Sequence, residues 1–126
     1  MSRWIPRLLV WIAFGHALLG AVLFREPLAA MLREGLVNTI GPVGGFDRKA
    51  AFWFLVFSAM LLLWGQLVAH ASERADARAL ALVGWNMLGV GVVGSLVMPV
   101  SGFWSVIALA PLVLREGRRL RGEARA

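Results

Sequence analysis

Two polar side chains lie deep inside apolar stretches of the sequence, where a polar group needs a reason. His16 is the one ionisable side chain far from the ends of such a stretch, within residues 4–24, and Ser58 lies within residues 50–70. An imidazole can carry a proton, act as a general acid or base, or hold a ligand near neutral pH. An ionisable side chain inside a membrane span is therefore a functional candidate by default.

The positions of these two residues predict that they meet. His16 lies eight residues before the end of its stretch at Phe24, and Ser58 lies eight residues after the start of the second stretch at Ala50. If the two stretches are helices that cross a membrane in opposite directions, both side chains lie about 12 Å below the same surface. We therefore predict a hydrogen bond between His16 and Ser58, which either fixes helix register or positions the imidazole for chemistry.

His16 and Ser58 lack the acidic residue within the spans that would complete a catalytic triad. The nearest acids, Glu26 and Asp47, lie in the first connection beside Arg25 and Arg48, where we expect interfacial ion pairs. HExxH motifs, paired intramembrane carboxylates and phosphate-binding glycine loops are missing from the sequence. The chain has no cysteine and thus no thiolate ligand. We expect neither a metal ion nor a cofactor.

Composition indicates that lipid surrounds these elements. Of the 126 residues 60% are hydrophobic and 16% are charged, whereas soluble domains are about 45–50% apolar and about 25% charged. The net charge of +6 does not indicate nucleic-acid binding, because the arginines gather at the ends of apolar stretches rather than on one basic face. The expected environment of the chain is therefore the lipid bilayer.

Hydropathy predicts an all-α integral membrane four-helix bundle in a single domain, residues 1–126. Three stretches of about 20 residues are long enough to span, and a fourth spans only if its arginines reach the interface. A short amphipathic helix is expected in the first connection, where Pro27 favours a helix start. The predicted spans are 4–24, 50–70, 80–100 and 103–120, and the amphipathic helix is 27–38.

The distribution of basic residues predicts the topology. With four spans, both chain ends and the second connection share a side that carries nine arginines, against four basic residues on the other side. The positive-inside rule then places both termini in the cytoplasm, and we expect the bacterial cytoplasmic (inner) membrane.

Small residues are expected at the contacts between helices. In the second span they recur every seven residues, and in the third they leave Asn86 on the opposite side, so that this helix can meet two neighbours. We also expect Asn86 to bond Gln66 within the membrane. The small residues are Ala51, Ser58, Gly65 and Ser72 in the second span, and Gly84, Gly91 and Ser95 in the third.

Five segments are spread along nearly the whole chain: Gly15-His16, residues 35–42, residues 48–55, residues 82–85 and residues 99–104. Together they resemble a family of small bacterial four-helix membrane proteins of unknown function. The resemblance implies a four-helix integral membrane protein and carries over no activity, ligand or functional residue. More distantly, the architecture is similar to that of the DoxX-like membrane proteins, which is an analogy of fold alone.

Parts of these segments cluster at the predicted outer ends of the helices, with His16 and Ser58 below them. They are Asn38 and Thr39, residues 52–54 and residues 101–104. A pocket that opens to the outer leaflet, with an aromatic rim and a histidine floor, would suit a small apolar or amphipathic molecule. The expected ligand-binding residues are His16, Ser58, Phe54, Asn38 and Trp104.

Three classes of function stay open. The first is a non-enzymatic bundle that binds a hydrophobic small molecule, a lipid or a partner protein from the outer leaflet side. The second is a membrane-embedded isomerase or hydrolase with His16 as general acid or base. The third is a small proton-coupled transporter that works as a homodimer. Its size is similar to that of small multidrug resistance transporters, but the glutamate of their first span is missing here.

Overall fold

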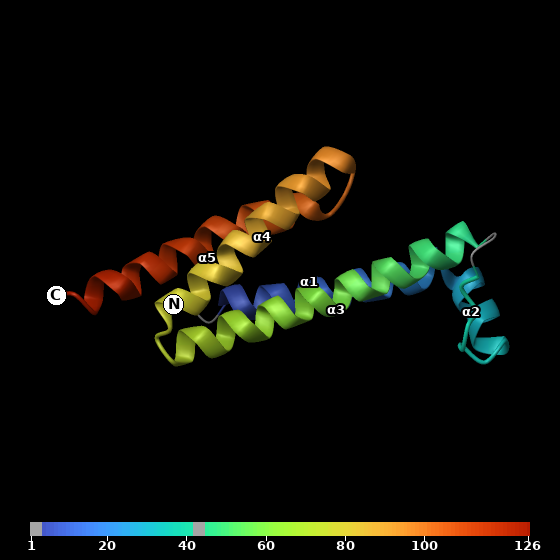
Figure 1. The fold of residues 1–126 in the computed structure, drawn as a ribbon, viewed down its shortest axis with the longest axis horizontal. Helices are drawn as coiled ribbons and strands as arrows, with labels where there is room; N and C mark the ends of the chain where they lie inside the picture. Colours follow the sequence, from blue (N-terminus) through green and yellow to red (C-terminus); the bar gives the residue numbers. More distant parts are fainter. Residues whose placement is uncertain (1–3, 42–44) are drawn as a thin grey trace. The chain divides into compact units, whose positions relative to one another are not determined.

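The computed structural model describes residues 4–41 and 45–126, and within them it is built of α-helices without a β-strand (Figure 1). The all-α prediction is therefore confirmed. Helices α1, α3 and α4 are each long and apolar enough to cross a membrane. The helices are α1 (Trp4–Leu23), α2 (Arg25–Arg33), α3 (Phe46–Glu73), α4 (Ala77–Val97) and α5 (Phe103–Glu123).

Several helix ends differ from the predicted spans, most of them by three residues. Helix α4 ends at Val97 rather than Val100, because Pro99 disfavours helical backbone at the residue before it, and Met98 adopts φ −130° and ψ 78°. Helix α5 runs without a break for 21 residues. Its apolar part ends at Leu114, and α5 is not one of the helices apolar enough to span.

Helix α2 is shorter than the predicted amphipathic helix 27–38. It begins at Arg25 and ends at Arg33, and Glu34 caps it. Beyond it the backbone takes positive φ angles of 87° at Gly35, 67° at Leu36 and 54° at Asn38. Left-handed residues cannot continue a right-handed helix. Residues 34–41 therefore form an irregular turn instead of the last part of the helix.

The chain forms two compact units. One is Val10–Leu62, which holds α2 and the adjoining parts of α1 and α3. The other combines Met1–Leu9 with Leu63–Ala126, and it contains all of α4 and α5.

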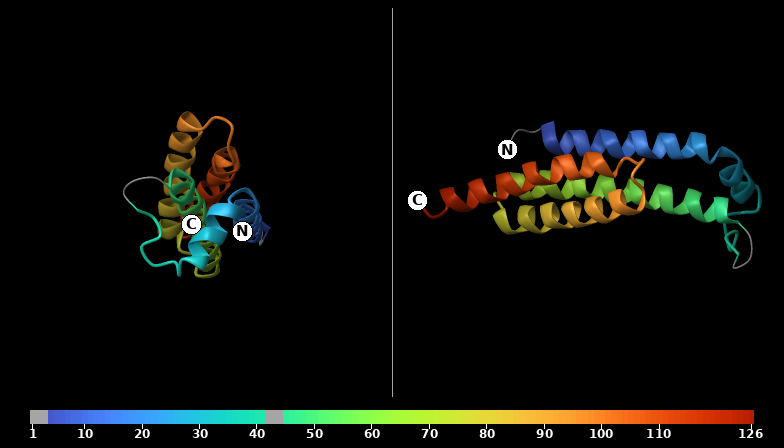
Figure 2. Two further views of the ribbon diagram at one scale, coloured as in Figure 1. Left: turned by 90° about the vertical axis from the view of Figure 1, so that its right-hand side faces the viewer. Right: turned by 90° about the horizontal axis from the view of Figure 1, so that it is seen from above.

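In the second unit, α4 and α5 lie side by side as an antiparallel hairpin (Figure 2). Glycines bring the two backbones close. A Cβ at Gly84 would lie 2.7 Å from Leu114 Cγ, and a Cβ at Gly91 would lie 2.8 Å from Ile107 Cγ1. The predicted contact face of α4 is thus confirmed. Close approach of this kind supplies the dispersion attraction on which helix pairs in lipid depend.

The opposite side of α4 contacts α3, as expected, but through a different pair of residues. Trp64 Nε1 donates a hydrogen bond of 3.0 Å to Asn86 Oδ1, and the Trp64 side chain is buried. The side-chain oxygen of Asn86 is thus bound by the indole, and the prediction of a bond to Gln66 was wrong. Gln66 is exposed.

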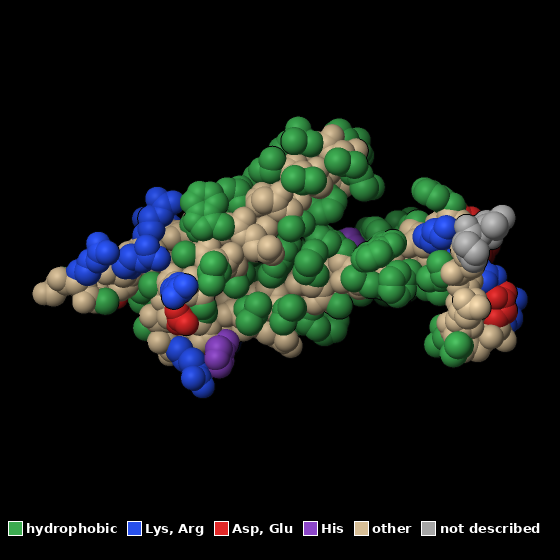
Figure 3. Space-filling model, in the orientation of Figure 1, with side chains coloured by type: hydrophobic (Ala, Val, Ile, Leu, Met, Phe, Trp, Pro, Cys, Tyr) green, Lys and Arg blue, Asp and Glu red, His purple; other side chains and the backbone are tan. Residues whose placement is uncertain are grey.

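Charged and hydrophobic side chains lie in different parts of this second unit. Lys and Arg side chains gather around the C-terminal half of α5 and the turn between α3 and α4, whereas the other end of the α4–α5 hairpin is largely apolar (Figure 3). At the basic end, the Asp76 carboxylate caps α4 by accepting hydrogen bonds from the backbone N–H groups of Arg78 and Ala79.

Candidate functional site

The candidate site lies in the unit Val10–Leu62, where α1 and α3 pack against each other in opposite directions. Small residues allow the two helices to approach. Ala13 and Gly20 of α1 are buried, as are Ala51 and Ser58 of α3. A Cβ at Gly20 would lie 2.6 Å from Phe54 Cδ1. The absence of a side chain at Gly20 therefore makes room for the Phe54 ring.

The predicted hydrogen bond between the two helices is present. His16 Nδ1 lies 2.8 Å from Ser58 Oγ. Ser58 Oγ also lies 3.1 Å from the carbonyl oxygen of Phe54, one helical turn earlier, and donates a hydrogen bond to it. Ser58 is buried, whereas His16 is half-buried. The serine thus anchors one side of an imidazole that stays partly accessible.

Aromatic rings fix the plane of the imidazole. The rings of His16 and Phe54 are stacked, with centroids 3.9 Å apart and an interplanar angle of 10°. Phe57 meets the imidazole edge-on at 5.4 Å, and Phe24 contacts Phe54 at 5.6 Å. Stacking and edge contacts of this kind are favourable beyond the area that they bury. The imidazole is therefore oriented by one hydrogen bond and two phenyl rings.

The structure brings together three of the five predicted ligand-binding residues: His16, Ser58 and Phe54. Asn38 lies exposed in the turn after α2. Trp104 belongs to the second unit, where its Nε1 donates a hydrogen bond of 2.8 Å to the carbonyl oxygen of Pro99.

Phe24 and Phe57 were missed as members of the cluster. Phe57 adjoins Ser58 in sequence, but a neighbour in a helix points about 100° away, so adjacency alone gives no signal. Phe24 is the last residue of the first apolar stretch, and its ring reaches Phe54 only because the chain turns into α2 at this point.

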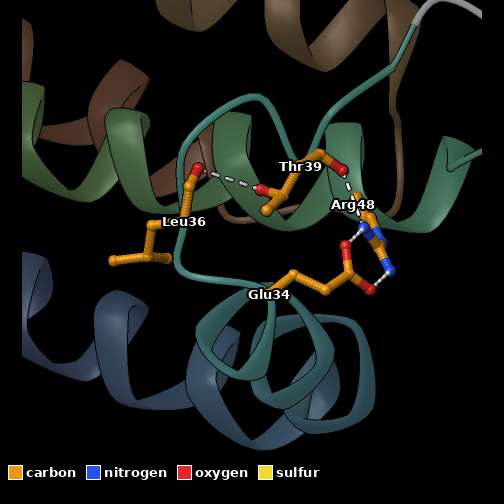
Figure 4. A network of polar contacts seen from close by, with 4 residues as sticks. All are labelled: Glu34, Leu36, Thr39 and Arg48. Carbon is orange, nitrogen blue, oxygen red and sulfur yellow. Dashed lines mark hydrogen bonds and ion pairs between the residues drawn. The ribbon is translucent and has the colours of Figure 1, made fainter.

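A polar network that the sequence did not indicate joins the turn after α2 to the start of α3 (Figure 4). Both terminal nitrogens of Arg48 donate to the Glu34 carboxylate, at 2.7 and 2.6 Å, and Nη1 also donates to the carbonyl oxygen of Thr39 at 2.8 Å. Thr39 Oγ1 in turn donates to the carbonyl oxygen of Leu36. Arg48 therefore pairs with Glu34, and the expected ion pair between Arg48 and the adjacent Asp47 was wrong.

The bidentate geometry of this pair has an electrostatic consequence. Hydrogen bonds from Arg48, together with its positive charge, hold the pKa of Glu34 below its ordinary value. The carboxylate stays ionised at neutral pH, and the connection is tied to the start of α3.

The chemistry available to the site is that of one imidazole. Within residues 4–41 and 45–126, no group of three or more His, Asp or Glu side chains is placed to hold a metal ion. The Ser58 hydroxyl is buried and hydrogen-bonded, so it is not presented as an exposed nucleophile. The imidazole can accept or donate a hydrogen bond through its second nitrogen.

Comparison with known families gives a match that covers residues 1–120. The matching model is described as a family of unknown function, DUF6463. The chain belongs to this family. Membership in DUF6463 confirms the predicted resemblance to a family of unknown function. Comparisons with curated proteins and with solved structures gave no match.

Proposed function

We propose that the chain is a non-enzymatic integral membrane protein that binds a hydrophobic small molecule or lipid at the His16–Ser58–Phe54 cluster. In this proposal it crosses the bacterial cytoplasmic membrane four times, with both termini in the cytoplasm, and the ligand enters from the outer leaflet. The observation that carries the proposal is the oriented, half-buried imidazole between α1 and α3.

The exposed surface supports the membrane environment. On α1 alone, Trp11, Phe14 and Leu18 are 72%, 59% and 69% exposed. A soluble monomer rarely exposes a continuous apolar surface of this extent, whereas lipid tails solvate it without cost. The apolar first half of α5 and the arginines that follow it fit a fourth span whose basic end lies at the cytoplasmic surface.

The arrangement of the pair supports binding over a purely packing role. A buried histidine with a purely packing role needs a hydrogen-bond partner for its ring nitrogens and gains nothing from leaving one of them unbonded. Here Ser58 and Phe54 occupy one nitrogen and one face of the ring, while the side chain remains half-buried. An apolar pocket with few, well-placed polar groups is the usual form of a small-molecule site.

Native mass spectrometry of the protein extracted in mild detergent tests this function. We expect a small molecule to be retained by the wild type and lost in His16→Phe, which keeps a planar ring but removes both nitrogens. His70→Phe is the matched control, because His70 lies exposed near the end of α3, and it should retain the molecule. Equal retention in both variants, or no retained molecule in the wild type, would refute the proposal.

A further inference from the structure

The Ser58 hydroxyl has one proton and two close neighbours. Phe54 O lies 3.1 Å away and His16 Nδ1 lies 2.8 Å away. A carbonyl oxygen can only accept, so the bond to Phe54 uses the hydroxyl proton. The oxygen of the hydroxyl then has only lone pairs left for the imidazole. Both bonds can form together only if His16 Nδ1 carries a proton and donates it to Ser58.

We propose that Ser58 holds His16 as the tautomer protonated on Nδ1, so that Nε2 is an unprotonated hydrogen-bond acceptor. The site then selects apolar ligands that carry a hydrogen-bond donor, namely a hydroxyl group. This inference rests on the proposed function, since it names the class of ligand for the same site.

The reverse assignment makes fewer hydrogen bonds. If the Ser58 hydroxyl donated to Nδ1, its bond to Phe54 would be lost, and the imidazole proton would move to Nε2. In hydrocarbon no water replaces the lost bond. Because the back-bond to the preceding turn and the bond to the imidazole are both within hydrogen-bonding distance, the network favours the tautomer that forms both.

The free nitrogen determines what the ligand must supply. None of the described residues donates a hydrogen bond to Nε2 or accepts one from it. Its lone pair lies in the ring plane, whereas the stacked Phe54 ring covers a face of the imidazole. A carbonyl, ester or ether oxygen would face this lone pair with a lone pair of its own. An alcohol or phenol hydroxyl would donate to it.

Nitrogen NMR tests the tautomer directly. Protein with ¹⁵N-labelled histidine and the substitution His70→Gln has one histidine, and its spectrum in bilayers at mildly alkaline pH separates protonated from unprotonated ring nitrogens. We expect a protonated Nδ1 and an unprotonated Nε2. Ser58→Thr keeps a hydroxyl that can make both bonds and should preserve this spectrum, whereas Ser58→Ala should shift population to the tautomer protonated on Nε2. A proton on Nε2 in the wild type would overturn the inference.

A pair of matched probes tests ligand selection. Dodecanol donates a hydrogen bond and dodecyl methyl ether does not, and binding of either is followed by the ring resonances of His16 and Phe54. We expect the alcohol to bind about tenfold more tightly than the ether, as one hydrogen bond to a buried acceptor would give. The preference should shrink in Ser58→Ala, and this comparison cancels the unequal partitioning of the probes into lipid.

The two experiments distinguish a failure of the proposed ligand class from a failure of the proposed binding function. Equal binding of alcohol and ether overturns the donor requirement and leaves the binding function standing. If the tautomer is as proposed but neither probe binds and native mass spectrometry finds no retained molecule, the binding function itself fails, and the ligand class falls with it.

Discussion

The close contact between α4 and α5 predicts that Gly91→Ala lowers the stability of the protein. The new Cβ would lie 2.8 Å from Ile107 Cγ1 and 3.2 Å from the Ile107 backbone nitrogen. Carbon atoms in good contact are roughly 3.5–4.0 Å apart, so the first distance is short by about 0.7 Å or more. Ile107 is β-branched and stiff in a helix, and a backbone nitrogen cannot rotate away. The two helices must therefore separate.

The expected cost of this overpacking is about 1–3 kcal/mol. Replacing glycine by alanine inside a helix also gains about 1 kcal/mol of helix propensity, which must be subtracted. Gly89→Ala is the matched control: Gly89 lies on the same helix and a Cβ there meets nothing within 4 Å. The difference in stability between the two variants therefore isolates the clash, and Gly91→Ala should be less stable than Gly89→Ala by about 1–3 kcal/mol.

Reversible unfolding in mixed micelles, with a denaturing detergent titrated against a mild one, measures this difference. A gap of about 1.4 kcal/mol corresponds to a tenfold change in the unfolding equilibrium constant, which the titration resolves. If the two variants unfold at the same detergent fraction, the close α4–α5 packing derived from Gly91 is refuted.

Three further predictions concern other contacts. Trp64→Phe should lose the bond to Asn86 and about 0.5–1.5 kcal/mol of stability in the same titration; an unchanged midpoint would contradict that bond. Because the pKa of Glu34 is lowered, its pairing with Arg48 should stabilise residues 34–41 at neutral pH and be lost as the pH falls through that pKa. Hydrogen exchange should show this loss of protection in the wild type, and Arg48→Gln should be unprotected throughout. Finally, single cysteines at Lys49 and Arg125 should react with a membrane-impermeant label from opposite sides of the membrane, and labelling from one side would refute the four-span topology.

The His16–Ser58 bond could be predicted because it depends on few quantities. Rise per residue and the opposite direction of two adjacent spans fix the depth of both side chains. Their positions on the small-residue faces fix the direction. Gly20, one turn after His16, and Ala51, two turns before Ser58, are both buried. The prediction thus required no knowledge of loop structure or of side-chain rotamers.

The contacts that sequence reasoning missed depend on local conformation. Glu34 reaches Arg48 only because Leu36 and Asn38 take left-handed backbone angles, which are uncommon for residues other than glycine. Gly35, which follows the capping residue of α2, is of the type that takes a positive φ most readily. The bond from Trp64 to Asn86 depends on the rotamer of a large side chain, which spacing along a helix does not specify.

Two polar contacts join apolar helices, Trp64–Asn86 and His16–Ser58, and they differ in how many hydrogen-bonding atoms of the aromatic ring stay unoccupied. Trp64 is 4% exposed, and its one polar atom, Nε1, is bound to Asn86. His16 is half-buried and has two ring nitrogens, of which Ser58 contacts one. The indole has no further N–H group to donate, and its hydrogen bond joins α3 to α4. The imidazole retains a second nitrogen, and it is held in plane by Phe54 and Phe57. The nitrogen of His16 that Ser58 leaves unoccupied is therefore a group from which a ligand can gain a directed interaction.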